Sequence, residues 1–510
     1  MSTKLTETPE ELGILDVEPY EEDRRARRAA KRERKRSRKK LHKQYEREVK
    51  HERVNYIPGV RYGWQGAFRP NNFWGSLNVD TKMRRATSFT VATAFPYVAS
   101  GSLGVPGVCL GTDETGGGAF YFDPWELYAA GILQGTSMVI LGSVGTGKST
   151  CVKAIVTRLV LAGRRGVVMT DKKGEWAIVS AFVGGVTIGV GTGSHTRINP
   201  LDEGNRPSTD AENKPLTDEK WAAMVRARRL SLLSSIVGIL DGKRMKSSPK
   251  KVMRICLDEA VAKATAQNRV PVLPDVMAEL ADPPEEVMEK KRLRDAAGAL
   301  SDTLSQLTDG DLVGMFDGES TVEFDASAPL VVFNTQGLDS LSEEGRKIAY
   351  ACTQSWAESM ITSRDFGQRV VVYEEGLDSI SDAGSLSRMV SQVKLARAYG
   401  IFNILVLHKL GDLDMAGDVG SKTRAQALSL LGDSDIRVVY HQNSDQHAIT
   451  RETLGLTARE TEKIGKFGVG VGLWKLGEHT RVVRVVMTKP EQPVFNTDAG
   501  MNVSSAPAAA

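Results

Sequence analysis

The stretch Met138-Val-Ile-Leu-Gly142-Ser-Val-Gly-Thr-Gly147-Lys148-Ser149 decides the fold class of this 510-residue chain. Residues 142–149 match GxxxxGK(S/T), the pattern of a phosphate-binding loop. The apolar residues 138–141 favour a buried strand before the loop, and residues 150–161 favour a helix after it. Because strand, glycine-rich loop and helix occur in this order, the sequence predicts a nucleoside triphosphate site in an α/β domain.

The residue types in this loop each have a chemical reason. Glycines allow successive backbone N–H groups to curl around an anion, and the helix that follows presents its positive end to phosphates. Lys148 is expected to reach the β- and γ-phosphates, and the Ser149 hydroxyl is expected to be a ligand of Mg²⁺. We therefore expect ATP and Mg²⁺ as cofactors, with the nucleotide held by nine consecutive residues: Gly142, Ser143, Val144, Gly145, Thr146, Gly147, Lys148, Ser149 and Thr150.

A second element, Val370-Val-Val-Tyr373-Glu374-Glu375, supplies four strand-forming residues that end in two carboxylates. A strand with acidic residues at its end is typical of a Walker B element. Glu374 is predicted to hold the Mg²⁺ shell and Glu375 to polarise the attacking water, since phosphoryl transfer depends on positioning and charge neutralisation. Glu374, Glu375 and Lys148 are therefore the first candidates for catalytic residues.

The chain around these elements alternates strand-like runs with helical patterns, which favours an α/β sheet with parallel strands. The runs lie at 138–141, 166–170, 330–333, 370–373, 401–407 and 436–440. Residues 203–325, between the second and third runs, have helical periodicity, and we expect an α-helical insertion because a structureless loop of that length is uncommon. The ATPase core is then divided into residues 131–202 and 326–500.

The N-terminal part has an uneven charge distribution. Residues 1–23, with eight acidic residues and one Lys, are expected to form a disordered acidic N-terminus. Residues 24–53 hold sixteen Lys and Arg against four Glu, without Gly or Pro, and predict a basic helical arm over 24–55. Such an arm suits the phosphates of nucleic acid or of an anionic membrane surface, and a solubilising tail is the alternative.

Two further segments complete the predicted domain organisation. Residues 56–130 are rich in Gly and Pro, with short β-prone runs at 88–94 and 119–122, and predict a small N-terminal α+β module. Residues 501–510 read as a short disordered tail.

Composition excludes several classes of protein. Hydrophobic residues make up 41% of the chain and charged residues 25%, and no run approaches the roughly 18 apolar residues that a transmembrane segment needs. The four cysteines lie far apart without CxxC spacing, and the seven histidines are scattered, so neither a zinc cluster nor a disulfide framework is indicated. With no export signal, we expect a cytoplasmic protein.

Other stretches are specific in combination. Residues 168–176, VMTDKKGEW, and 197–202, RINPLD, resemble the DPKGEY and R-NPLD pair of the FtsK–HerA superfamily, especially of its conjugative-transfer branch, the type IV secretion motor ATPases. Residues 406–413, 432–442 and 472–474 resemble three further stretches of the soluble subgroup of that branch. The resemblance runs from about residue 68 to residue 501.

The resemblance implies a RecA-like P-loop ATPase that works as a homo-oligomeric ring, a hexamer, with nucleotide bound between subunits. By matching position, it implies that His408 senses the γ-phosphate and that Arg437 serves the nucleotide of a neighbouring subunit. An ordinary strand-end histidine and a surface ion pair are the alternatives for these two residues. Asp171 and Glu175 either reach metal or water, or cap the following helix.

The resemblance also implies partners. We expect nucleic acid and the proteins of a secretion channel or of the membrane, with the chain at the inner face of that membrane. The leading function is then an ATP-driven motor for DNA or protein transfer in conjugation or type IV secretion.

The chain departs from the family at Glu374-Glu375, where relatives have Asp then Glu, so the carboxylate on the Mg²⁺ side is one methylene longer. Two alternatives to the motor stay open, and this difference motivates the second of them. One is a DNA translocase of FtsK or HerA type that works without a secretion channel, and the other is an ATP-binding assembly scaffold that hydrolyses poorly.

Overall fold

The structure, a computed structural model, describes residue 36 and residues 103–495 with gaps. The gaps are residues 211, 213, 244, 308–309, 323–324, 326, 363–364, 366, 375–385, 387–388, 391–392, 394–395, 409, 411–426, 429 and 433. The chain divides into two compact units, Met1–Ala94 and Phe95–Ala510, and the fold below belongs to the second. The acidic N-terminus, the basic arm apart from Arg36, the run at 88–94, Glu375 and the tail lie outside the described residues.

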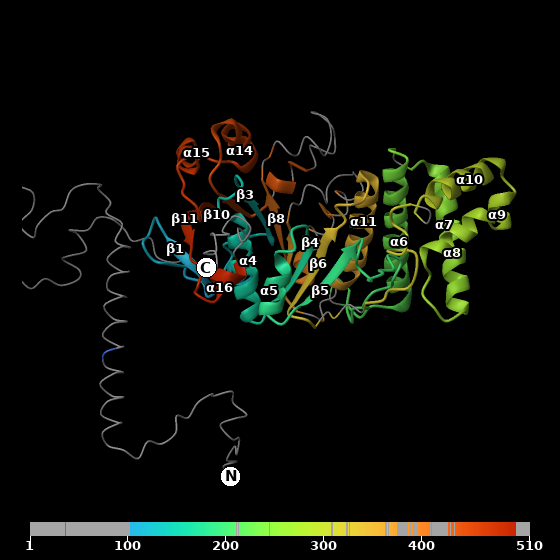
Figure 1. Cartoon of the computed structure of the whole chain (residues 1–510), viewed down its shortest axis with the longest axis horizontal. Helices are drawn as coiled ribbons and strands as arrows, with labels where there is room; N and C mark the ends of the chain where they lie inside the picture. The colour runs from blue at the N-terminus through green and yellow to red at the C-terminus, as the bar shows by residue number, and fades with distance from the viewer. Residues whose placement is uncertain are drawn as a thin grey trace, which may run out of the picture. The chain divides into compact units, whose positions relative to one another are not determined.

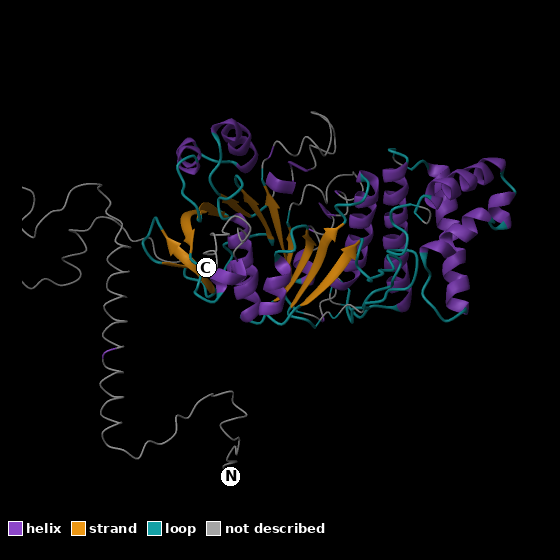
Figure 2. Cartoon of the chain, viewed as in Figure 1, coloured by secondary structure: helices purple, strands orange, loops and turns teal. Residues whose placement is uncertain are grey.

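One mixed sheet of eleven strands organises this unit (Figures 1 and 2). Its strand order is β2-β1-β11-β10-β9-β3-β8-β7-β4-β6-β5. The strands are β1 (Val108–Asp113), β2 (Ala119–Phe122), β3 (Ser137–Leu141), β4 (Arg165–Asp171), β5 (Val186–Gly191), β6 (Leu330–Gly337), β7 (Arg369–Tyr373), β8 (Ile401–Leu407), β9 (Ile436–Val439), β10 (Val471–Leu476) and β11 (His479–Val485).

The seven strands from β9 to β5 are parallel. Their central members are almost entirely apolar and buried, as expected of strands covered on both faces. Each of the six strand-like runs of the sequence coincides with one of these strands. The predicted α/β fold is therefore confirmed, and β5 is added to it.

Two apolar cores cover the two faces of the sheet. Neighbouring residues of β3 alternate between them: Met138 and Ile140 pack in one core, Val139 and Leu141 in the other. Helices α4 (Lys148–Leu161), α5 (Trp176–Phe182) and α16 (Glu491–Phe495) contribute to the first core. Helices α6 (Asp218–Leu240) and α11 (Glu343–Ile361) contribute to the second, and Figure 1 shows them to the right of β4, β6 and β5, with α4 and α5 to the left.

The antiparallel strands β10, β11, β1 and β2 extend the sheet beyond β9. Strands β1 and β2 and helix α3 (Pro124–Ala129) come from the end of the predicted N-terminal module, so this part of the segment continues the main sheet. Trp474 of the GLW stretch is fully buried there, with its ring edge-on to Phe120 and Phe122 of β2. Helices α14 (His447–Leu454) and α15 (Ala458–Ile464) lie between β9 and β10 in the chain.

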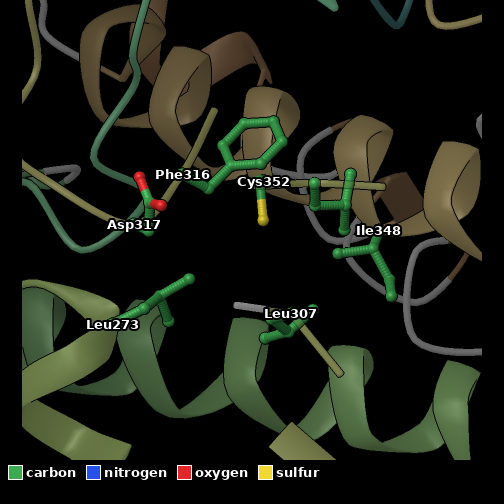
Figure 3. A pocket seen from close by; sticks show the side chains of 7 residues that line it. Leu273, Leu307, Phe316, Asp317, Ile348 and Cys352 are labelled. Atoms are coloured by element: carbon green, nitrogen blue, oxygen red, sulfur yellow. The ribbon is translucent and has the colours of Figure 1, made fainter. Parts of the chain in front are cut away.

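Between β5 and β6 the chain forms five helices: α6, α7 (Ser247–Ala266), α8 (Leu273–Ala281), α9 (Glu285–Met288) and α10 (Lys291–Ser305). Helices α7 to α10 lie together beyond α6 (Figure 1). A small apolar pocket separates them from α11, and Figure 3 shows Leu273 and Leu307 on one side of it with Ile348 and Cys352 on the other. Asp317 is its one charged lining residue.

Among the described residues, no helix combines the length and the apolar character needed to cross a membrane.

Candidate nucleotide-binding site

The candidate site lies at the carboxyl edge of the parallel strands. Strand β3 ends at Leu141, which is in register with Leu407 of β8 on one side and with Val439 of β9 on the other. The phosphate loop that begins at Gly142 therefore starts between His408 and Tyr440, the residues that follow those two strands. Ligand sites of parallel α/β sheets lie at this edge.

The loop has the backbone conformation that phosphate binding requires. Gly145 and Gly147 have φ of 76° and 100°, in the left-handed region that glycine adopts without a steric penalty. Gly147 is the N-cap of α4 and provides no side-chain cap, so the first-turn N–H groups remain available to an anion. Val144 lies at the exposed tip of the loop with 80% of its surface accessible.

Neighbouring segments hold the loop from behind. A Cβ atom added to Gly142 would lie 2.6 Å from the Cβ of Tyr440, and one added to Gly147 would lie 3.1 Å from the Cα of Gly470. The backbone N–H of Gly470 also donates to the carbonyl of Thr146 at 3.0 Å. Close packing against the residues that follow β9 and precede β10 therefore requires glycine at these two positions, in addition to the phosphate binding predicted for the loop.

Lys148 is folded over the loop. Its ammonium donates to the carbonyl of Gly142 at 2.6 Å and to that of Ser143 at 2.8 Å, and the residue is 4% exposed. Burial, aided by the positive charge of Lys173, lowers the pKa of Lys148 to about 8, and the negative charge of Glu374 opposes this shift. The positive charge of this buried ammonium is not compensated by its neutral carbonyl partners, and the oxygens of a bound triphosphate would compensate it.

Glu374 directly follows β7, which is separated from β3 by β8. Its carboxylate Oε2 accepts a hydrogen bond from the indole Nε1 of Trp176, and its carbonyl accepts one from the Thr170 hydroxyl at 2.7 Å. Burial raises the pKa of the Glu374 carboxyl, while the Trp176 hydrogen bond and the charge of Lys153 oppose the rise. The orientation of this carboxylate is thus fixed by a neighbouring strand and helix.

Two more carboxylates lie beside Glu374. Asp171 ends β4 and accepts hydrogen bonds from the backbone N–H groups of Glu175 at 3.1 Å and Trp176 at 2.9 Å. Glu175 forms an ion pair with Lys153 at 2.9 Å, and the Lys153 side chain is only 1% exposed. Of the two alternatives for Asp171 and Glu175, these contacts show Asp171 binding the start of α5 and Glu175 neutralising a buried lysine of α4.

These groups line one pocket at the end of β4 and β7: Thr170, Asp171, Lys172, Lys173, Glu175 and Glu374. Its carboxylate and hydroxyl oxygens are the hard ligands that Mg²⁺ prefers. Together with the Ser149 hydroxyl in the first turn of α4, Glu374 supplies a donor set that fits this ion. The predicted assignment of Ser149 and Glu374 to the metal stays a prediction.

The remaining predicted residues have different positions. His408 follows β8 between Gly142 and Glu374 in strand order. Arg437 lies on β9 and donates hydrogen bonds to three backbone carbonyls of its own chain: Gly432, Ser434 and Leu454. Their predicted roles toward nucleotide stay predictions.

The RINPLD stretch lies apart from this pocket and fastens the helical insertion. The Asp202 carboxylate accepts hydrogen bonds from the Ser320 hydroxyl at 2.6 Å and from the indole of Trp356 at 3.1 Å. Its carbonyl accepts from Arg228 of α6 at 2.6 Å, and the carbonyl of Leu201 accepts from Arg229 at 2.6 Å. This motif therefore joins α6, the chain leaving the insertion and α11.

Sequence reasoning gave no role to Trp176, Lys153 or Tyr440. Lys153 did carry a signal, because it is a charged residue within the apolar run of α4 and needs a partner once buried. Trp176 stands in the VMTDKKGEW stretch, but its contact with Glu374 spans 198 positions of sequence and has no local signature.

Comparison with known proteins identifies the architecture. No family model matches the chain, and no curated protein matches it either. The chain has a fold similar to that of VirB4. The structure of VirB4 from Thermoanaerobacter pseudethanolicus is 19% identical in sequence, with a TM-score of 0.62, and the match covers 76% of this chain and 98% of that one.

The plasmid coupling protein TrwB matches with lower scores. Its complex with the ATP analogue ADPNP has a TM-score of 0.44 at 15% identity, and its complex with ADP and Mg²⁺ has 0.43 at 14%; each match covers 71% of this chain and 88% of TrwB. TrwB is a bacterial conjugative coupling protein. The likeness to VirB4 confirms the RecA-like P-loop architecture of this chain.

Proposed function

We propose that this chain is a Mg²⁺-dependent ATPase that couples nucleotide turnover to DNA or protein transfer in a conjugation or type IV secretion apparatus. The observation that supports this proposal most is that the phosphate loop after β3 and Glu374 after β7 lie at the same edge of the sheet, with β8 between the two strands. The resemblance of the motifs to type IV secretion motor ATPases and the VirB4-like fold support the choice of apparatus.

The residues of the chain would divide the work as follows. The loop N–H groups and Lys148 bind the phosphates, and the ammonium exchanges its carbonyl partners for phosphate oxygens. Ser149 and Glu374 hold Mg²⁺, which neutralises the charge that develops on the transferred phosphoryl group. Glu375, the next residue, orients water for attack, and His408 contacts the γ-phosphate.

We further propose a homo-oligomeric ring, a hexamer, with Arg437 completing the site of a neighbouring subunit. In this proposal the ring works on the cytoplasmic side of the membrane, against channel proteins, and the basic arm contacts phosphates of nucleic acid or lipid. The proposed arrangement of domains keeps the predicted insertion at 203–325 between the two parts of the core, and adds β1 and β2 to the sheet of that core.

The assembly scaffold is a second candidate because of one contact. The indole of Trp176 occupies one oxygen of Glu374, so this carboxylate has fewer free lone pairs for the metal shell than an unbound one. A scaffold would bind ATP and change its assembly state without sustained turnover. A channel-independent DNA translocase would share the site and differ only in its partners.

Steady-state ATP turnover by the purified full chain tests the proposal. We expect Mg²⁺-dependent hydrolysis that Lys148→Ala abolishes and that single- or double-stranded DNA stimulates. ATP binding without turnover at any DNA concentration would favour the scaffold. Stimulation by duplex alone would favour the translocase.

A further inference from the structure

The helical insertion carries two groups of exposed basic residues that its fold does not use. The first group surrounds the start of α7: Lys243, Lys246, Lys250 and Arg254. The second surrounds the start of α10: Lys290, Lys291, Arg292 and Arg294. All eight side chains are exposed, and no ion pair or hydrogen bond of any of them is found within the part of the chain that the structure describes.

Other cations of the same segment are paired. Lys220 contacts Asp210 at 3.0 Å, Arg226 contacts Asp258, and Arg269 contacts Asp275 at 2.6 Å. The eight cations named above have no such ion pair among the described residues, although acidic residues are present in the same segment. Between residues 243 and 257 the sequence has six Lys and Arg and no Asp or Glu.

The two groups belong to one end of the insertion. Lys251, next to Lys250, forms an ion pair with Glu286 of α9 at 3.1 Å, and α9 ends two residues before Lys290. Helices α7 and α10 also pack against one another. The N-cap of α7, residue 246, and the exposed residues 250 and 254 of the helix recur every four positions, so they form a row along one side of the helix.

Helix stability does not explain the row. Cations near the first turn of a helix face the positive end of its dipole, which is unfavourable. No acidic residue lies in the first turn of α7 to offset them. A sequence that gathers like charges at some cost to local stability indicates a binding function.

We propose that this surface, made of Lys243, Lys246, Lys250 and Arg254 with the α10 group beside it, binds the phosphate backbone of nucleic acid. The inference rests on the proposed function, which supplies a motor that acts on DNA. Within the described residues of the insertion, the exposed large apolar side chains are Met224, Met288 and Val313, of which only Met288 adjoins the basic residues in sequence.

That composition decides between partners. A protein interface usually has an apolar core, and a membrane-binding surface inserts apolar side chains below the headgroups. Binding of a polyanion through backbone phosphates needs neither, because the release of counterions supplies the free energy. The row of cations supplies the charges that a polyanion needs. It lacks the group of apolar side chains that a protein or membrane partner would need.

The test compares two charge-matched variants of the full chain. The first, Lys246→Ala/Lys250→Ala/Arg254→Ala, removes the row. The second, Lys220→Ala/Arg226→Ala/Arg269→Ala, removes three paired cations of the same segment and changes the net charge equally. The three cations have 56%, 48% and 31% of their side-chain surface exposed, so we expect their loss to cost little stability, which thermal melting checks.

Fluorescence anisotropy with a labelled 30-nucleotide single strand and a 30-base-pair duplex measures binding from 50 to 300 mM salt. Each phosphate contact contributes about −0.9 to the slope of log K against log salt for duplex DNA. We therefore expect the slope of the first variant to be less negative than that of the unmodified chain by about 2 to 3. Its affinity at low salt should fall at least tenfold. The control variant should keep the slope of the unmodified chain.

Equal slopes in the two variants would overturn the inference, even if the unmodified chain binds DNA and the proposed function stands. Absence of any DNA binding by the unmodified chain would overturn the inference, whereas the proposed function would stand in its protein-transfer form if ATP turnover persists. If the first variant binds DNA normally and instead loses binding to vesicles with anionic lipid, or to an acidic polypeptide, the surface serves that partner and the inference is wrong. ATP turnover without DNA should be equal in all three proteins.

Discussion

Replacing Trp176 by Phe tests how the structure holds the Walker B carboxylate. The substitution removes the indole N–H that binds Oε2 of Glu374 and keeps an aromatic ring in the core. A hydrogen bond to a charged group contributes about 1.5 to 3 kcal/mol, which corresponds to roughly a 10- to 150-fold change in an equilibrium. If Glu374 holds Mg²⁺, the concentration of Mg²⁺ for half-maximal turnover should rise about tenfold or more.

Trp356→Phe is the matched control. Trp356 is also buried, and its indole also donates to a carboxylate, that of Asp202 at 3.1 Å, outside the nucleotide pocket. Both variants lose a similar volume and a similar hydrogen bond, so both should unfold at lower temperature. Only Trp176→Phe should alter the Mg²⁺ dependence of ATP turnover.

The longer side chain of Glu374 gives a second measurement. Glu374→Asp withdraws the carboxylate from the indole, so the two substitutions should be strongly non-additive in a double-mutant cycle. Additive effects, or a Mg²⁺ dependence that shifts equally in Trp176→Phe and Trp356→Phe, would refute the view that Trp176 orients the Walker B carboxylate.

Three further predictions concern the same site. The pKa of Lys148 is about 8 in the free protein, and a bound triphosphate would raise it, so ATP binding should take up a proton between about pH 8 and 10. The affinity for ATP should therefore fall as pH rises through that window. Calorimetry in buffers of different ionisation enthalpy measures the proton uptake, which Lys148→Met should remove. Glu375→Gln should retain ATP binding and stop hydrolysis, since an amide cannot polarise water, and the opposite result with Glu374→Gln alone trapping ATP would exchange the two roles. Mixing Arg437→Ala chains with Lys148→Ala chains should restore some turnover if an interface pairs an intact loop with an intact arginine, whereas an inactive mixture would remove Arg437 from the shared site.

Local sequence was sufficient for the parallel part of the sheet. Strands such as β3 and β7 are short apolar runs buried on both faces, and their neighbours in the chain are helices, so composition and order identify them. Strand β5 gave no such signal, because two of its six residues are glycine and its first two are exposed. It is a strand because β6 pairs with it, which is a tertiary effect.

The antiparallel extension could not be predicted in the same way. Strand β1 pairs with β11, so that Gly111 lies opposite Val485 across more than 370 positions of sequence. Nothing in either strand specifies that partner, since the choice depends on which sheet edge remains open after β9 and β10 have paired. The end of the predicted N-terminal module is therefore part of the main sheet.

The residues of the candidate site likewise divide into those with a local sequence pattern and those whose contacts depend on the tertiary fold. The glycines, Lys148 and Glu374 stand in patterns whose chemistry is local, so the sequence names them as candidates. Trp176 and Lys153 act through Glu374 and Glu175, and their roles appear only when α4, α5 and β7 are brought together. The residues proposed to bind the ligand thus have a local signature in the sequence, and the residues that orient them do not.

Arg437 shows how placement limits a proposed role. It lies opposite Val139 in the register of β9 and β3, three residues before Gly142, so its backbone is roughly 10 Å from the edge where its own phosphate loop begins. Its guanidinium uses three of its five N–H groups on carbonyls of its own chain, at Ser434 and Leu454 among them, and has no carboxylate partner among the described residues. That arrangement gives it little access to the nucleotide of its own subunit. It leaves two donors and a full charge on a rigidly held side chain, which is what an arginine that serves an adjacent subunit requires. The same three hydrogen bonds would also explain the presence of Arg437 if its role is only to hold α14 against β9.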